Sequence, residues 1–288
     1  MQGVRRTGIY PLTLLALMAG PMSAPATQQI GGAGRTILAT VVDAGERPQV
    51  DLGLDDFVVS EDGEDREILD VHIADYPVAL LIDDKVGSAA IPAIKIAAGR
   101  FVTRIGERPV VVGTLSGAGS GPGSLDYDRT EVLRRIEALS AGVSSGTSTL
   151  AAVAGAAKLL KDAGAPFSAI VIVAAGPIDA TQLVQGDLLP AILESGTTIH
   201  VVAGRTAGVS DTPDAAPPDL LRVLSDQTHG QYTAIFSSAS YGIALDRLAD
   251  RLAVELMVSY LVPPDTASGD VKVGVRRAGA RVLGLGVR

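Results

Sequence analysis

The sequence contains no cysteine and no tryptophan, and aromatic residues make up only 3% of the chain. Without cysteine it can form neither disulfide bonds nor thiolate metal sites, and catalysis by a thiol is excluded. The scarcity of aromatic side chains disfavours stacking on nucleic-acid bases. His72, His200 and His229 are far apart in sequence and lack the spacing of metal ligands, so we interpret them as structural or surface residues.

Charge and hydrophobicity narrow the functional classes further. The 288 residues carry a net charge of −8, so we expect no nucleic-acid partner and no attraction to anionic lipid. Hydrophobic residues make up 47% of the chain, which is enough for one large domain or a medium domain with a smaller module. The abundance of alanine, valine, leucine and glycine is typical of helices packed on a sheet.

The first 26 residues have the three parts of an export signal. Arg5 and Arg6 form a positive start, Leu12 to Ala19 an apolar stretch, and Ala24 to Ala26 a small-residue cleavage pattern. We therefore predict a signal peptide over residues 1–26 and a periplasmic or extracellular protein, with a twin-arginine signal as the alternative. The apolar stretch is too short to span a bilayer, so we expect no membrane insertion after cleavage. Cleavage removes two arginines and no acid, which leaves a net charge of −10.

A small β module is predicted after a glycine-rich lead-in. We expect residues 27–35 to be flexible because glycine dominates them. Thr36 to Asp43 and Phe57 to Glu64 contain two short strands and an Asp-Gly turn. Ile68 to Ala74 alternates apolar and polar residues, which is typical of a half-buried antiparallel strand. We place this N-terminal β module at residues 36–76.

Over residues 77–256 the pattern changes to strands that alternate with helices. Apolar runs such as Val78 to Ile82 and Ser168 to Ala174 indicate parallel strands buried on both faces. The last helix of this region is predicted to be long, from Tyr241 to Leu256. This order predicts an α/β fold with a doubly wound, mainly parallel sheet and helices on both faces. Residues 257–288 return to period-two alternation, and we expect their strands to complete the β module.

One predicted strand ends on a loop that combines acidic, basic and glycine residues. Directly after Ile82 the chain reads Asp83, Asp84, Lys85, Val86, Gly87 and Ser88. Ligands of open α/β sheets bind beyond the carboxyl ends of the strands. We therefore expect this loop to lie at the functional end of the sheet.

Several short motifs occur in an order and spacing that point to one family. The segment from Leu54 to Gly63 reads LDDFVVSEDG, and Leu80 to Asp83 follows it. The further motifs are Gly146-Thr147-Ser148, Ile170 to Gly176, Thr228 to Tyr232 and Val258 to Pro263. Together they resemble the von Willebrand factor A-related proteins of the acidobacterial type. The resemblance covers residues 36–288 and implies a Rossmann-like A domain over residues 77–256.

The resemblance also implies a metal-ion-dependent adhesion site. In that family an Asp and two Ser come from the first loop, a Thr from a second loop and an Asp from a third, because a hard divalent cation prefers oxygen ligands. Carried over to this sequence, Asp83 and Thr147 are retained, whereas Lys85, Gly87 and Ala175 stand at the other three positions. We therefore expect a degenerate site without a bound metal ion, and weak binding of Mg²⁺ is the alternative.

Lys85 suggests how such a site could work without a cation. Its ammonium group, two residues from Asp83, could occupy the place of the metal and pair with the carboxylate. The alternative is that Lys85 points into solvent, since lysine is rarely buried.

A second chemistry is suggested by the segment from Gly142 to Gly146, which matches the nucleophile pattern Gly-x-Ser-x-Gly with Ser144 at its centre. The segment before it is predicted to be a helix, whereas the nucleophile turn follows a strand. A serine-rich loop that caps the next helix explains the same residues. Possible triad partners are His200, His229, Asp179 and Asp226. A serine hydrolase is therefore the less favoured alternative.

These observations predict an exported, non-catalytic protein-protein interaction module that works without a metal ion. By analogy with the family, it would bind a protein partner at the carboxyl end of the sheet. The predicted binding surface comprises Asp83, Lys85, Gly87, Ser88, Thr147 and Ser148. The alternative within the binding class is a metal-dependent adhesion domain in which water replaces the missing ligands.

Overall fold

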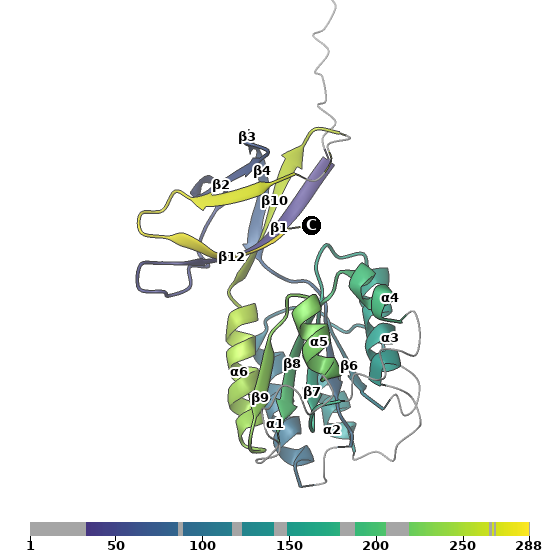
Figure 1. Cartoon of the computed structure of the whole chain (residues 1–288). Helices are drawn as coiled ribbons and strands as arrows, with labels where there is room; N and C mark the ends of the chain where they lie inside the picture. Colours follow the sequence, from purple (N-terminus) through teal and green to yellow (C-terminus); the bar gives the residue numbers. More distant parts are fainter. Residues whose placement is uncertain are drawn as a thin grey trace, which may run out of the picture. The chain divides into compact units, whose positions relative to one another are not determined.

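The computed structural model describes residues 33–85, 89–116, 123–140, 149–178, 188–205, 219–264, 267 and 269–287. The predicted signal peptide lies outside this part of the chain. A parallel sheet with helices and two smaller antiparallel sheets make up the described structure (Figure 1). Within the described ranges, no helix has both the length and the apolar character that a membrane span requires.

The parallel sheet has the strand order β6-β5-β7-β8-β9, and every neighbouring pair is parallel. The bounds are β5 Val78–Ile82, β6 Val110–Thr114, β7 Ala169–Ala174, β8 Thr198–Gly204 and β9 Tyr232–Ile235. The chain passes from β5 to β6 on one side and then to β7 on the other side of β5. The sheet is therefore doubly wound, and its order reverses between β5 and β7.

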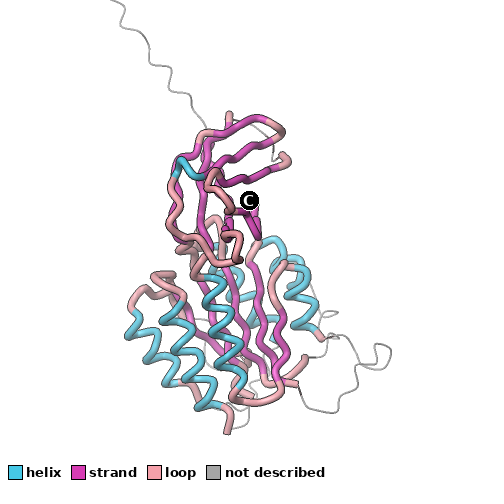
Figure 2. Tube along the Cα trace, turned by 90° about the vertical axis from the view of Figure 1, so that its left-hand side faces the viewer, coloured by secondary structure: helices cyan, strands magenta, loops and turns pink. Residues whose placement is uncertain are grey.

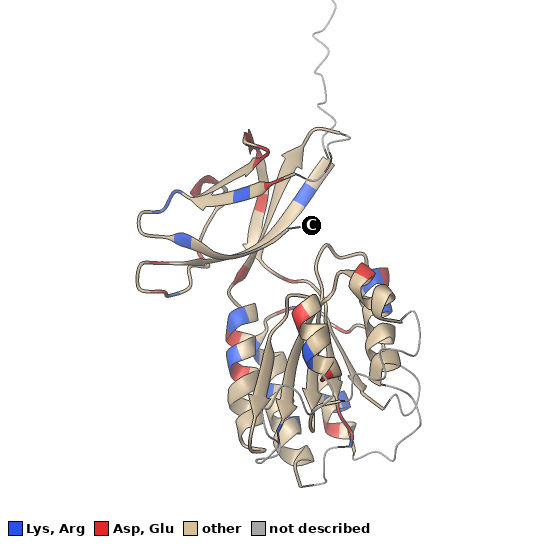
Figure 3. Cartoon of the chain, in the orientation of Figure 1, with Lys and Arg blue, Asp and Glu red and all other residues tan. Residues whose placement is uncertain are grey.

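Helices cover both faces of this sheet (Figure 2). Their bounds are α1 Ile91–Arg104, α2 Arg129–Ala138, α3 Thr149–Asp162, α4 Leu188–Ser195, α5 Leu220–Gln227 and α6 Ser240–Leu252. Val78, Leu80 and Ile82 face the core that contains α1, α2 and α6, whereas Ala79 and Leu81 face α3, α4 and α5. No Lys, Arg, Asp or Glu lies on the five strands (Figure 3), as expected for strands buried on both sides. The predicted α/β fold class is confirmed.

The antiparallel sheets combine strands from both ends of the described chain. One has the order β12-β1-β10-β4 and the other the order β11-β2-β3. The bounds are β1 Ala33–Val42, β2 Phe57–Glu61, β3 Glu64–Arg66, β4 Ile68–Ile73, β10 Glu255–Val262, β11 Val271–Val275 and β12 Arg281–Val287, with a short 3₁₀ helix η1 over Leu54–Asp56. As predicted, the C-terminal strands complete the β module, because β10 and β12 flank β1 and β11 pairs with β2.

Two element boundaries differ from the prediction. β1 begins at Ala33, inside the expected flexible lead-in, because the strand pairs with β10 as far as Val262. The last helix, α6, ends at Leu252, whereas the sequence predicts that it continues to Leu256. Leu256 belongs to β10, where it is buried between Ala39 of β1 and Ile73 of β4. An apolar segment that also suits a helix therefore becomes a strand here, because it has strand partners on both sides.

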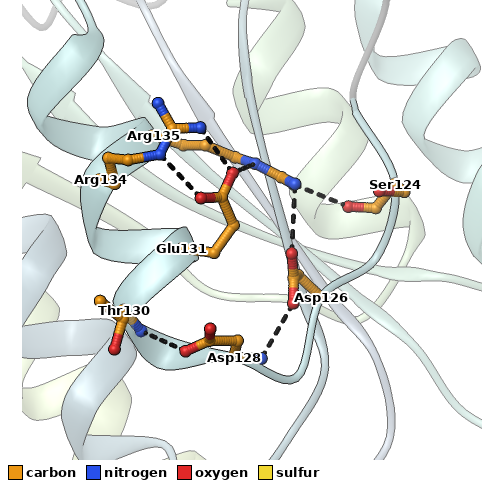
Figure 4. A network of polar contacts seen from close by, with 7 residues as sticks. All are labelled: Ser124, Asp126, Asp128, Thr130, Glu131, Arg134 and Arg135. Carbon is orange, nitrogen blue, oxygen red and sulfur yellow. Dashed lines mark hydrogen bonds and ion pairs between the residues drawn. The ribbon is translucent and has the colours of Figure 1, made fainter.

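A polar network fixes the segment that leads into α2 (Figure 4). The Asp128 side chain accepts a hydrogen bond from the Thr130 amide and caps the helix. Arg135 of α2 reaches back to Asp126, at 3.2 Å. Glu131 accepts hydrogen bonds from Arg134 and Arg135. These bonds lower the pKa of Glu131 to about 2, and the bond from Arg134 contributes most. The network ties residues 124–128 to the first turns of the helix.

A buried charge cluster joins the start of β6 to β10. Arg108 is 1% exposed, and its Nη2 donates a hydrogen bond to the Leu252 carbonyl oxygen, at 2.9 Å, and lies 3.4 Å from Glu255 Oε2. The guanidinium stacks on Tyr76, with its carbon 4.5 Å from the ring centroid. Tyr76 Oη donates to Glu255 Oε2 at 2.6 Å. Burial raises the pKa of Glu255, and it raises the pKa of Tyr76 well above its usual value.

Candidate functional site

The loop after β5 lies at the point where the strand order of the sheet reverses. β5 pairs with β6 on one side and with β7 on the other, so the segments that follow these three strands meet at one edge. Such a switch point leaves a crevice between loops that run in opposite directions, which is where open α/β sheets place ligands. The expectation that Asp83 follows β5 at the carboxyl end of the sheet is met.

Asp83 is buried and works as an acceptor for backbone amides. Its own amide continues the sheet by donating to the Val173 carbonyl oxygen, at 2.8 Å. Asp83 Oδ1 accepts a hydrogen bond from the Lys85 amide, and Oδ2 accepts one from the Ala175 amide, each at 3.0 Å. One carboxylate therefore ties its own loop to the end of β7, across 92 residues of sequence.

Asp84 is also buried, with 4% of its surface exposed. Its Oδ2 accepts a hydrogen bond from the Ser116 hydroxyl, which follows β6. Its Oδ1 is buried and has no hydrogen-bond partner among the described residues. Asp84 and Asp83 thus bind the β5 loop to the ends of both neighbouring strands, β6 and β7.

Lys85 is exposed, and within the described ranges no carboxylate lies within ion-pair distance of its ammonium group. Its contact with Asp83 uses the backbone amide. The hypothesis that the Lys85 side chain replaces the metal charge is therefore not supported by this geometry, and the alternative, a lysine that points into solvent, describes the structure.

Tyr241 and Gly204 close the buried side of the site. Tyr241 Oη donates to the Ala174 carbonyl oxygen, at 2.7 Å, and burial together with the nearby Asp83 charge raises its pKa to about 12. A Cβ atom at Gly204 would lie 2.3 Å from the Ala175 carbonyl oxygen and 3.2 Å from Tyr241 Oη. Glycine is therefore required for β8 to approach the end of β7 this closely.

The described residues do not fit a divalent cation of the family's type. At Ala175, where the resemblance requires a carboxylate ligand, the backbone amide presents a hydrogen atom to Asp83. Each Asp83 oxygen already accepts one N–H hydrogen bond, and Lys85 offers no oxygen from its side chain. No group of three or more His, Cys, Asp or Glu residues that could hold a metal ion occurs in the part of the chain described.

Four residues of the predicted binding surface lie outside the described residues: Gly87, Ser88, Thr147 and Ser148. The same holds for Ser144 and Asp179, which belong to the hydrolase alternative. His200 is described, and it lies near the amino-terminal end of β8. Burial, followed by the Arg251 charge, lowers its pKa to about 3. A general base works best with a pKa near the operating pH, so His200 is poorly suited to that role.

Sequence reasoning missed Asp84, Ser116, Tyr241 and the exposed Phe236. The family pattern reads alternate positions of the loop, and Asp84 falls between them. Ser116 and Tyr241 are brought to the site by strand pairing and helix packing, for which the sequence carries no local signal. Phe236 follows β9 at the same end of the sheet, and its surface is 72% exposed.

No protein-family model matches the sequence, and no curated protein matches it. Similar solved structures include "von Willebrand factor type A from Catenulispora acidiphila", with 15% identity, a TM-score of 0.48 and coverage of 83% of this chain and 74% of the other. The protein BatB from Bacteroides thetaiotaomicron has 15% identity, a TM-score of 0.45 and coverage of 62% and 98%. The vWF domain of the type V pili tip protein Mfa5 from Porphyromonas gingivalis has 11% identity, a TM-score of 0.44 and coverage of 62% and 96%. The solved structures that this chain resembles therefore include von Willebrand factor type A domains.

Proposed function

We propose that the chain is an exported, non-catalytic module of the von Willebrand factor A type that binds a protein partner without a metal ion. The binding surface lies at the carboxyl end of the parallel sheet, on the loops that follow β5 and β9. Periplasmic or extracellular location is part of the proposal, and it is supported by the export-signal pattern of residues 1–26.

The observation that carries the proposal is the hydrogen bonding of Asp83. Its two oxygens accept amide hydrogens from Lys85 and Ala175, so the loop is organised by its own backbone. A loop held in this way is preorganised before a partner arrives, which lowers the entropic cost of binding. A metal ion would have to share the carboxylate oxygens with these donors.

Two exposed side chains at this end are suited to contact a partner. Lys85 is exposed beside β5, and Phe236 is exposed after β9. The two strands are separated by β7 and β8, so their ends lie about 14 Å apart, at about 4.8 Å for each strand spacing. Both therefore fit within one protein interface of ordinary size, in which an aromatic residue is a frequent anchor.

Thermal unfolding of residues 27–288 in EDTA and in excess Mg²⁺ or Mn²⁺ tests whether the folded protein binds a metal ion. We expect the same midpoint under all conditions, because an ion that does not bind the folded state cannot shift the unfolding equilibrium. A midpoint that rises with Mg²⁺ in the wild type and stays constant in Asp83→Ala would instead establish the metal-dependent alternative.

Affinity capture from an envelope fraction of the native host, with EDTA present, tests whether a protein partner binds at this end of the sheet. The captured proteins are identified by mass spectrometry. Lys85→Glu and Phe236→Ser should abolish capture of the same protein. Tyr127→Ser is the matched control, because Tyr127 is 76% exposed and lies beside Asp126, which bridges to the first residue of β6 at the opposite end of the sheet. If Tyr127→Ser abolishes capture while Lys85→Glu and Phe236→Ser do not, the recognition surface lies at the amino-terminal end of the sheet.

A further inference from the structure

A cavity of about 220 Å³ lies at the amino-terminal end of the parallel sheet, opposite the proposed protein-binding surface. One wall consists of residues just before β7 and at the start of β8, including Phe167, Thr198 and His200. The other wall is a face of the antiparallel sheet that contains Leu38 and Thr40 of β1. This volume is several times what one water molecule needs, so the cavity suits a small organic ligand.

The cavity exists because strand β12 carries two glycines on this face. Gly284 pairs with Thr40, and Gly286 pairs with Leu38, so all four residues lie on the side of the sheet that lines the cavity. A Cβ atom at Gly284 would meet no heavy atom within 4 Å. Space that side chains fill elsewhere in the sheet is therefore left open.

His200 offers the cavity a hydrogen-bond donor. Its Nδ1 accepts a hydrogen bond from the Gln231 amide, at 3.2 Å, so the hydrogen of the neutral ring is on Nε2. Burial keeps the ring neutral, since it lowers the pKa to about 3. No described residue accepts a hydrogen bond from Nε2. The donor is thus available to a bound molecule.

Arg251, an exposed residue at the end of α6, gives the cavity a positive charge, which also favours the ionised form of the nearby Glu255. Its Nη1 donates a hydrogen bond to Gln231 Oε1, at 3.3 Å, and no acidic group in the described ranges lies within ion-pair distance. Glu255 also lines the cavity, but its Oε2 is held by Tyr76 and Arg108. The two guanidinium groups of Arg108 and Arg251 lie near the single carboxylate of Glu255, and this excess of one positive charge favours a ligand with a single negative charge over a dianion.

We propose that this cavity binds a small monocarboxylate with a short apolar tail. The carboxylate accepts hydrogen bonds from Arg251 and from His200 Nε2, and the tail packs between Leu38 and Phe167. Arginine pairs well with a carboxylate because its parallel N–H groups match the two oxygens. The proposal is independent of the protein-binding function, because the two sites use opposite ends of the sheet.

Isothermal titration calorimetry on residues 27–288 tests the proposal with sodium isovalerate, which has seven non-hydrogen atoms. We expect saturable binding of isovalerate, and binding of isovaleramide and of succinate at least about tenfold weaker, because the amide has no charge and succinate has two. Absence of saturable heat up to about 10 mM isovalerate, or equal binding of isovalerate and isovaleramide, would overturn it.

Three variants locate the bound ligand. Arg251→Gln should weaken isovalerate binding by about tenfold or more, since it removes a charge-assisted hydrogen bond. Arg247→Gln is the matched control, one helical turn away on the exposed face of α6, and should bind as the wild type does. Gly284→Val should also weaken binding by narrowing the cavity, with the thermal midpoint preserved because no atom obstructs the new Cβ. Unchanged binding in both Arg251→Gln and Gly284→Val would place any bound isovalerate elsewhere and refute the site.

Discussion

Asp83 at the carboxyl end of the parallel sheet and Glu255 at its amino-terminal end are both buried, and they are held in different ways. At the carboxyl end, Asp83 accepts hydrogen bonds from the backbone amides of Lys85 and Ala175. At the amino-terminal end, Glu255 is held by the side chains of Tyr76 and Arg108. Backbone donors come with the fold itself, whereas side-chain donors must be supplied by particular residues.

The difference predicts where the molecule tolerates change. At the carboxyl end, substitution of a side chain next to Asp83 leaves its amide donors in place, so the loop surface can vary while its scaffold persists. At the amino-terminal end, loss of one side chain leaves a charge buried without a partner. The first arrangement suits a recognition surface, and the second suits a structural junction.

Removal of Arg108 should have the largest effect. Arg108→Ala leaves Glu255 buried with Tyr76 as the remaining hydrogen-bond partner of its side chain, and we expect a loss of about 3 kcal/mol in the free energy of unfolding. Urea denaturation at pH 7 measures it. The double variant Arg108→Met/Glu255→Met should lose less than the two single changes combined, because no charge is then left unpaired. Strict additivity would show that the pair is not coupled.

Gly204→Ala should destabilise the carboxyl end by about 2 kcal/mol. Its Cβ would lie 2.3 Å from the Ala175 carbonyl oxygen, so either β8 or the end of β7 must move. Gly176→Ala is the control, since its Cβ would make an ordinary contact of 3.7 Å with the Gly204 carbonyl oxygen. Equal thermal midpoints for the two variants would contradict the close approach of these strands.

Asp83→Ala should cost about 1 to 2 kcal/mol, because it leaves the amides of Lys85 and Ala175 without acceptors. Lys85→Ala removes a solvent-exposed side chain and keeps both hydrogen bonds, so we expect a change below about 0.5 kcal/mol. Chemical denaturation of the two variants compares them directly. A larger loss for Lys85→Ala would mean that the side chain, and not the backbone, holds the loop.

A further expected effect is a pH dependence from His200. Its folded-state pKa of about 3 lies below the usual 6.5, so the unfolded chain takes up a proton that the folded chain does not. Its stabilising contribution is therefore complete above pH 6.5 and is lost as the pH falls toward 3, by up to about 1.4 kcal/mol per pH unit. His200→Asn should reduce this decline between pH 6.5 and 5 in urea titrations. If the free energy of unfolding falls equally with pH in the wild type and in His200→Asn, His200 is not the source of the pH dependence.

Local patterns were sufficient for most of the elements. Unbroken apolar runs identified β5 and β7, because burial on both faces leaves a direct trace in the sequence. Alternation identified the strand β4, although its burial does not alternate, since Leu69 and Ile73 are exposed. The end of α6 was not predictable in the same way. Leu256 suits a helix and a strand equally, and its burial between β1 and β4 decided the outcome.

The candidate site was predictable only in part. The position of Asp83 follows from the strand before it and from the family motif. Its partner Ala175 was expected as a missing ligand, and the structure presents its amide as a donor instead. Side-chain identity cannot reveal such a contact, because every residue except proline has an amide hydrogen.

The sequence by itself determined the α/β class, the contribution of both chain ends to the β module and the place of the loop after β5, because each of these depends on the local order and periodicity of side chains. The tertiary structure alone decided which groups meet at the two ends of the sheet. The Asp83 hydrogen bonds and the glycine-lined cavity arise from strand register and from contacts between residues far apart in the chain. The hydrophobic pattern restricts which face of a strand is buried, but which distant strands pair is decided only when the sheet packs.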